Sequence, residues 1–166
     1  MTRTFRLATV DDAEELLALT LRAYAPIREL GIHFAAATAD LALVQKNIHN
    51  HACYVLEEDG QIQATVSLRM PWGPQPGPFG LPHIWWFAVD PAISKKGIGS
   101  ALLTWVEEVI VRDTLKAPAV SLGTAEEHPW LSAIYERRGY VRAGEANLGR
   151  GHTTIYFRKE LQKSLP

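Results

Sequence analysis

The sequence is poor in cysteine and has no long apolar run. Cys53 is its only cysteine, so a disulfide within the chain is excluded and a reducing compartment is indicated. No apolar run reaches the roughly 18 residues that a membrane-spanning helix requires, and residues 1–4 are not followed by an apolar stretch of the secretory type. We therefore expect a cytoplasmic protein that has no membrane partner.

The sequence also has no excess of positive or negative charge. Lysine and arginine number 17, aspartate and glutamate 18, and the formal net charge is −1. Nucleic acid is therefore not predicted as a partner, because its recognition needs a basic surface. Hydrophobic residues make up 47% of the chain, and without repeats or long linkers they predict a single domain over residues 1–166. No metal site is predicted, because His33, His49, His51 and His152 lack the spacing of metal ligands.

What the sequence does have is a distinctive segment between residues 84 and 109. The apolar run Ile84–Val89 predicts a buried strand, which an Asp-Pro pair terminates. Gly97 and Gly99 then open a helix whose apolar residues recur at intervals of three and four. Those residues are Ile98, Ala101, Leu102, Trp105, Val106 and Val109. The charged residues off this stripe are expected to face water; they are Glu107, Glu108 and Arg112.

A helix that opens in this way can bind a phosphate. The first N–H groups of a helix have no partner within it and carry partial positive charge, and glycine lets a phosphate approach the main chain. Lys95 and Lys96 add positive charge at the same place. Two common nucleotide motifs do not fit. The chain has no Gly-x-x-x-x-Gly-Lys-[Ser/Thr] run, and Gly97–Leu102 lacks the third glycine of the dinucleotide motif.

The segment resembles the acetyl-CoA signature of the GNAT acetyltransferase superfamily. Residues 87–91 resemble the Leu/Phe-Ala-Val-x-Pro strand end of that family, and Gly97 and Gly99 match the small positions of its [Arg/Gln]-x-x-Gly-x-[Gly/Ala] motif. The run Ile134–Tyr140 resembles the Leu-Tyr-Glu-x-x-Gly-Phe ending of a second family segment, and residues 6–13 resemble the family's opening strand and helix.

Two positions depart from the family pattern. Ser94 stands where the family has arginine or glutamine, and His128 stands where it has asparagine. The contacts of those side chains with CoA therefore do not carry over directly.

The resemblance implies the GNAT fold, of the α/β (α+β) class. This fold has a central mixed, mostly antiparallel sheet of about seven strands, splayed at the CoA site and flanked by about four helices. The implied activity is an acetyl-CoA-dependent N-acetyltransferase, which moves acetyl to a primary amine of a small molecule or a peptide or protein by direct attack in a ternary complex. The positions implied to contact the co-substrate acetyl-CoA are Phe87, Ala88, Val89, Ser94, Lys95, Lys96, Gly97, Ile98, Gly99, Ser100, His128 and Tyr135.

Amide formation from a thioester also needs a base for the ammonium group and an acid for the departing thiolate. The resemblance makes Tyr135 the acid. His83 falls where some GNAT enzymes have a glutamate base, and the ordinary pKa of histidine suits that task. Glu126, Glu127 and His128 form a competing group of bases.

Hydrophobic patterns and turn residues predict the remaining elements. Strands are expected at residues 5–8, 52–57, 61–69, 119–123, 140–145 and 153–159, and helices after a cap at Thr9, over about 38–50 and from Pro129 to Gly139. Residues 71–82 alternate proline and glycine and predict a stiff loop. Cys53 is interpreted as a packed strand residue, and Trp85 and Trp86 are expected on opposite faces of their strand.

The sequence leaves several questions open. The departures at Ser94 and His128 permit an alternative function, a catalytically silent acyl-CoA-binding sensor or interaction module. The acceptor amine and the preferred acyl chain length are not identified. Both a monomer and a homodimer are compatible with the sequence.

Overall fold

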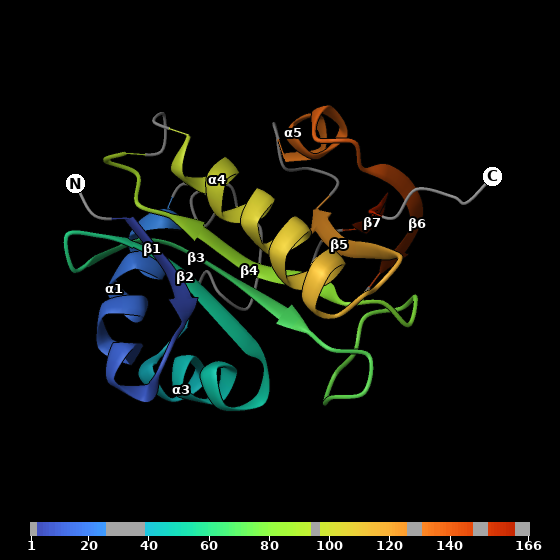
Figure 1. The fold of residues 1–166 in the computed structure, drawn as a ribbon. Coiled ribbons are helices and arrows are strands. Elements are labelled where there is room, and N and C mark those ends of the chain that lie inside the picture. Colours follow the sequence, from blue (N-terminus) through green and yellow to red (C-terminus); the bar gives the residue numbers. More distant parts are fainter. Residues whose placement is uncertain (1–2, 26–38, 94–96, 126–130, 148–152, 162–166) are drawn as a thin grey trace.

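The computed structural model describes residues 3–25, 39–93, 97–125, 131–147 and 153–161. Its centre is a seven-stranded sheet with the strand order β1-β2-β3-β4-β5-β7-β6 (Figure 1). The strands are β1 (Arg3–Leu7), β2 (Ala52–Glu58), β3 (Gln61–Arg69), β4 (His83–Val89), β5 (Ala119–Ala125), β6 (Val141–Asn147) and β7 (Thr153–Glu160). Of the pairs that these strands form, β4–β5 alone is parallel. The predicted mixed, mostly antiparallel sheet is confirmed.

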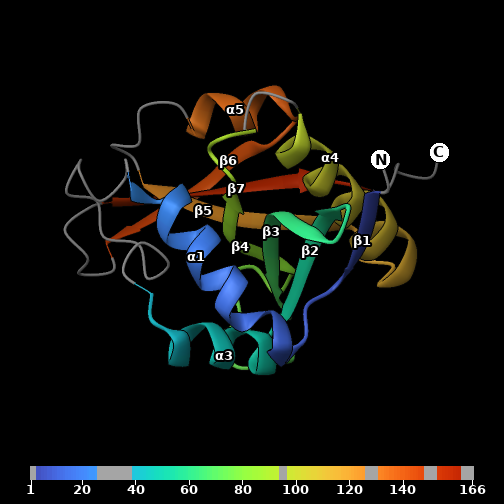
Figure 2. The ribbon, with the colours of Figure 1, turned by 90° about the vertical axis from the view of Figure 1, so that its left-hand side faces the viewer.

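Helices cover both faces of the sheet (Figures 1 and 2). One face carries η1, a 3₁₀ turn (Val10–Asp12), α1 (Ala13–Ala23) and α3 (Leu41–Asn50). The other carries α4 (Ile98–Trp105), its π-helical continuation η4 (Val106–Thr114) and α5 (Leu131–Arg137). The four α-helices of the described residues agree with the predicted number. None of the helices in these ranges is both long enough and apolar enough to cross a membrane.

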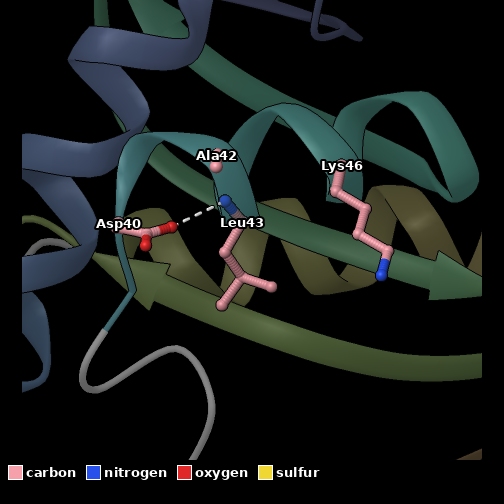
Figure 3. A pocket seen from close by; sticks show the side chains of 4 residues that line it. All are labelled: Asp40, Ala42, Leu43 and Lys46. Carbon is pink, nitrogen blue, oxygen red and sulfur yellow. Dashed lines mark hydrogen bonds between the residues drawn. The ribbon is translucent and has the colours of Figure 1, made fainter.

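Local residue chemistry explains where several elements begin and end. α3 starts at Asp40, whose carboxylate accepts the N–H of Leu43 at 2.8 Å beside a shallow surface hollow (Figure 3). The turn between β2 and β3 has positive φ at both central residues, 53° at Asp59 and 81° at Gly60, as a tight hairpin requires. An Asp-Gly pair is typical of such a turn.

β4 contains a bulge that the sequence did not predict. Val66 of β3 lies opposite two residues of β4, because the pairing shifts between Thr65 and Ser67. Trp86 in this bulge has φ of 54°, a conformation that costs a residue other than glycine about 1–3 kcal/mol. Its indole N–H donates to Thr20 of α1 at 3.0 Å, which holds the bulge against the helix.

The bulge makes the prediction for the two tryptophans wrong. Trp85 and Trp86 were expected on opposite faces, but both pack in the cluster beneath α1 and α3, with ring centroids 5.2 Å apart. An inserted residue shifts the alternation of side chains by one, so neighbouring residues can share a face.

The helix after Gly97 also differs from its α-helical prediction. Wide turns begin at Val106, and the N–H of Leu115 donates to the carbonyl of Ile110, five residues earlier, at 2.8 Å. The wider turn places Val111 in the core, fully buried, and leaves Val109 41% exposed. Val109 was therefore wrongly predicted to lie on the buried face.

Glu107 was expected to face water, but it is only 2% exposed. Its carboxylate accepts hydrogen bonds from Tyr140 at 2.6 Å, Lys159 at 2.8 Å and Arg138 at 3.1 Å. Glu107 lies off the apolar stripe as predicted, yet the end of α5 and strand β7 cover that side of the helix. The buried charge is thus surrounded by donors, as a buried carboxylate requires.

Candidate active site

The Gly97–Ser100 turn has the backbone geometry of an anion site. Gly97 caps α4 with φ of 74°, and a side chain added there would meet nothing within 4 Å. The helix begins here, since the N–H of Ala101 donates to the carbonyl of Gly97 at 3.0 Å. The N–H groups of Ile98, Gly99 and Ser100 precede this first bond, so they have no partner within the helix and lie at its positive end, where a phosphate can bind. Ser94, Lys95 and Lys96 lie outside the described residues.

Gly99 has a packing role that the sequence did not predict. A Cβ at this position would lie 2.7 Å from Val89 and 2.9 Å from Phe87. Glycine is therefore needed so that α4 can pack closely on β4, and its backbone N–H remains at the mouth of the turn. The turn and the end of β4 are thus brought together, and their assignment to one CoA site stays a prediction.

The β4 edge beside the turn diverges from its parallel neighbour. β4 pairs with β5 at His83–Ser121 and Ile84–Leu122, and the described strands form no further pair between them. β4 nevertheless continues to Val89 along β3, and β5 continues to Ala125 along β7. Phe87, Ala88 and Val89 therefore lie beside a gap in the sheet, where an extended ligand can bind to the main chain.

Tyr24 is a site residue that the sequence did not single out. Its hydroxyl donates to the carbonyl of Phe87 at 2.7 Å, within this gap. Burial raises the pKa of Tyr24, and the nearby phenol of Tyr135 raises it further. Tyr24 directly follows α1 and Tyr135 lies on α5, on opposite sides of the sheet, so only the folded structure brings them together.

Tyr135 is held in a specific position on α5. Its side chain is 5% exposed, and its ring lies 5.6 Å from that of Tyr140 and 6.5 Å from that of Phe157. Gly139, with φ of 97°, ends the helix and turns Tyr140 back against it. Burial raises the pKa of Tyr135, whose phenol is protonated at neutral pH even at its ordinary pKa and is therefore available as a proton donor.

Arg138 connects the Gly97–Ser100 turn to α5. It donates to Ser100 at 2.9 Å, to Thr104 at 3.0 Å and to the buried carboxylate of Glu107 at 3.1 Å. Since Tyr135 precedes Arg138 by one helical turn, this link fixes the distance between Tyr135 and the start of α4.

His83 lies where β4 and β5 part, on the face that carries α1 and α3. It is 6% exposed, its Nδ1 lies 2.8 Å from the hydroxyl of Ser121, and its ring packs against Gly77 of the proline-rich loop. Burial, and then the charge of Arg69, lower its pKa to about 4. His83 is therefore neutral at pH 7 and a weaker base than an ordinary histidine.

The structure describes only some of the remaining candidate residues. Glu126, Glu127 and His128 lie outside the described residues. Cys53 is buried beside Thr65, and burial raises the pKa of its thiol, as expected of a packed strand residue. Within the described ranges, no three histidine, cysteine or carboxylate side chains are grouped as metal ligands.

Comparison with known proteins gives consistent results. The profile of the acetyltransferase (GNAT) family matches residues 15–140. S-(2-succino)cysteine N-acetyltransferase of Bacillus subtilis (strain 168) is 68% identical over 161 residues, which cover 97% of this chain and 98% of the relative. S-alkylcysteine N-acetyltransferase of the same organism is 50% identical over 137 residues, covering 82% and 77%. The crystal structure of PaiA N-acetyltransferase from Thermoplasma acidophilum in complex with coenzyme A has the same fold, with a TM-score of 0.74 at 13% identity over 96% of this chain and 99% of that chain.

Gly97→Glu tests the phosphate role of the Gly97–Ser100 turn. A carboxylate at the start of α4 would repel the CoA phosphates, so we expect the dissociation constant of CoA to rise by at least about tenfold, measured by calorimetry. Gly97→Ala is the matched control, because it brings the same strain at positive φ without the charge. Equal losses of affinity in the two variants would show that charge at this turn does not matter.

The low pKa of His83 predicts a specific loss of stability in acid. With a folded pKa of about 4 and an ordinary value of 6.5, the unfolded chain binds a proton that the folded chain does not, so stability falls as pH drops below 6.5. Between pH 7 and 4.5 urea unfolding should therefore lose about 2 to 3 kcal/mol more in the wild type than in His83→Gln. Exposed His49 supplies the control His49→Gln, which should follow the wild type. The same loss in His83→Gln would contradict the burial of a neutral His83.

Proposed function

The chain belongs to the GNAT acetyltransferase family and is an N-acetyltransferase, and on this premise we propose that its acceptor is the α-amino group of an S-substituted cysteine, above all S-(2-succino)cysteine. The observation that carries the proposal is the 68% identity, over 97% of the chain, to an enzyme named for that acceptor. The second relative is named for S-alkylcysteine. Both names share the cysteine amine and differ in the group on sulfur.

The donor side of the site fits acetyl-CoA, which supplies the acetyl group as a thioester when bound. The N–H groups of the Gly97–Ser100 turn would hold the diphosphate, and the open space beside Gly97 leaves room for it. Phe87, Ala88 and Val89 would hold the extended arm of CoA along the unpaired edge of β4. A main-chain N–H near Ala88 or Val89 would stabilise the oxyanion.

Two proton transfers complete the reaction. Tyr135 would donate a proton to the departing thiolate, since its phenol is protonated at neutral pH. The base that receives the proton of the ammonium group is His83 or the group of Glu126, Glu127 and His128, and the low pKa of His83 makes it the weaker candidate.

The amine would attack the thioester directly, without an acyl-enzyme. Cys53, the only cysteine, is 4% exposed, and burial disfavours its thiolate. A covalent relay through cysteine is thus unsupported, and both substrates would have to be bound together.

An acceptor panel tests this proposal. Purified protein with acetyl-CoA should release free CoA thiol in the presence of S-(2-succino)cysteine and, more slowly, S-methylcysteine, and mass spectrometry should find one acetyl group on the cysteine nitrogen. A polyamine, a free lysine and an N-terminal peptide serve as comparison acceptors. Faster turnover of any of these than of the cysteine derivatives would overturn the proposed acceptor, and CoA binding without turnover of any amine would favour a silent binding module.

Tyr135→Phe tests the acid. We expect turnover to fall about 100-fold while the dissociation constant of CoA stays within about threefold, because only the proton donor is lost. Tyr54→Phe is the matched control: Tyr54 is also buried, on β2, and packs against Trp105. Turnover of Tyr135→Phe equal to that of the control would remove Tyr135 from the reaction.

A further inference from the structure

A polar group of side chains lies on the face of the sheet opposite α4, where β4 and β5 begin to part. We call His51, Arg69 and Trp85 the Trp85 cluster. Arg69 ends β3 and lies opposite His83 of β4, while Trp85 lies opposite Ser67. Because alternate residues of a strand share a face, these side chains project toward α1 and α3 rather than toward the CoA side.

The guanidinium of Arg69 is stacked on an aromatic ring. Its central carbon lies 3.7 Å from the centroid of the Trp85 ring, and the His51 ring meets the same indole nearly edge-on, with centroids 5.6 Å apart. A stacked guanidinium keeps its N–H groups in the plane of the stack, where they can bind a carboxylate through two parallel hydrogen bonds.

Several polar atoms around Trp85 lack a hydrogen-bond partner. Among the described residues, the indole N–H of Trp85, Nδ1 of His51 and the amide oxygen of Asn47 are buried and have none. Asn47 belongs to the same group, because its amide donates to Ser67 at 2.9 Å. Buried polar atoms are rarely left in this state, so their grouping at one place indicates a site for a polar ligand.

The charge of Arg69 extends toward the gap between β4 and β5. It lowers the pKa of both His51 and His83, although burial is the larger cause for each. His83 is the first of the two β4 residues that pair with β5, and the strands part directly after the second. The positive potential of Arg69 therefore reaches the point where the strands part. An acceptor approaching from the face of α1 and α3 would therefore meet a positive field.

We propose that Arg69, stacked on Trp85, binds a carboxylate on the S-substituent of the acceptor and so selects acidic S-substituted cysteines over neutral ones. This role rests on the proposed function, because it assumes a cysteine acceptor whose amine reaches the gap between β4 and β5. The succinyl group carries two carboxylates, whereas an S-methyl group carries none. Arg69 is thus a specificity residue on the acceptor side, separate from the residues that hold acetyl-CoA.

Arg69→Gln tests this role with two acceptors. For S-(2-succino)cysteine, kcat/KM should fall about 10- to 100-fold, mostly through KM, because one charge-assisted contact is lost. For S-methylcysteine it should stay within about threefold of the wild-type value, since both acceptors share every group except the S-substituent. Arg142→Gln, at an exposed arginine of β6 that pairs with Glu145, is the control and should change neither value.

Turnover of the neutral acceptor S-methylcysteine distinguishes a loss of carboxylate recognition from a general loss of folded protein. A similar loss for both acceptors, or no loss for either, would overturn the role of Arg69. Should Arg69→Gln fail to fold, Arg69→Lys keeps the charge but loses the flat double contact, and it should lower kcat/KM for the succinyl acceptor alone.

A binding measurement distinguishes this proposal from the proposed function. Calorimetry with S-(2-succino)cysteine and the CoA-bound protein should show binding that Arg69→Gln weakens. If wild-type protein acetylates neither cysteine derivative, the proposed function is wrong. If it acetylates them while Arg69→Gln binds the succinyl acceptor as tightly as the wild type does, the proposed function stands and the role of Arg69 is wrong. Absence of both binding and turnover in the wild type overturns both.

Discussion

The candidate active site depends on the early end of pairing between β4 and β5. After two paired residues the strands part, while β3 and β7 continue to hold their outer edges. A sheet that stayed paired would leave no unused main-chain groups at Phe87–Val89 and no passage from one face to the other. The bulge at Trp86 lies at this point, and the hydrogen bond from Trp86 to Thr20 offsets part of the strain of its positive φ. The divergence thus creates both the donor edge and the opening toward the acceptor face.

A second constraint fixes the position of α4 relative to α5 on the donor side. Glu107 is buried among Arg138, Tyr140 and Lys159, and removing one partner from such a group typically costs several kcal/mol. Through Arg138 the same group reaches Ser100, and through Tyr140 it supports the ring of Tyr135. The start of α4 and the proposed acid of α5 are therefore held by one polar network, although they are far apart in the sequence. Catalysis benefits from such rigidity, because small displacements of a proton donor reduce its effect.

The sequence predicted features that depend on neighbouring residues and missed those that depend on distant ones. The strand at β4, the glycine turn and the first part of the helix after it follow from local spacing and were correctly predicted, whereas the π-helical continuation from Val106 was not. The bulge was missed because nothing in a Trp-Trp-Phe run indicates a positive φ at tryptophan. The burial of Glu107 was missed because its partners are distant in the sequence: Arg138 at the end of α5, Tyr140 just before β6 and Lys159 of β7. Tyr24 was likewise not singled out, since its contact with Phe87 joins α1 to β4.

The same distinction separates the two substrates of the reaction. The proposed donor site consists mainly of backbone N–H groups and an unpaired strand edge, so it requires only small residues at a turn and a gap in the sheet. The proposed acceptor side consists of side chains from the end of α3, the end of β3 and the start of β4, and each of these is ordinary in its own segment. A stacked arginine selects mainly by charge, and charge at one position can change without disturbing the sheet or the donor site. Proteins that share this donor site can therefore differ in acceptor through a few residues on the opposite face.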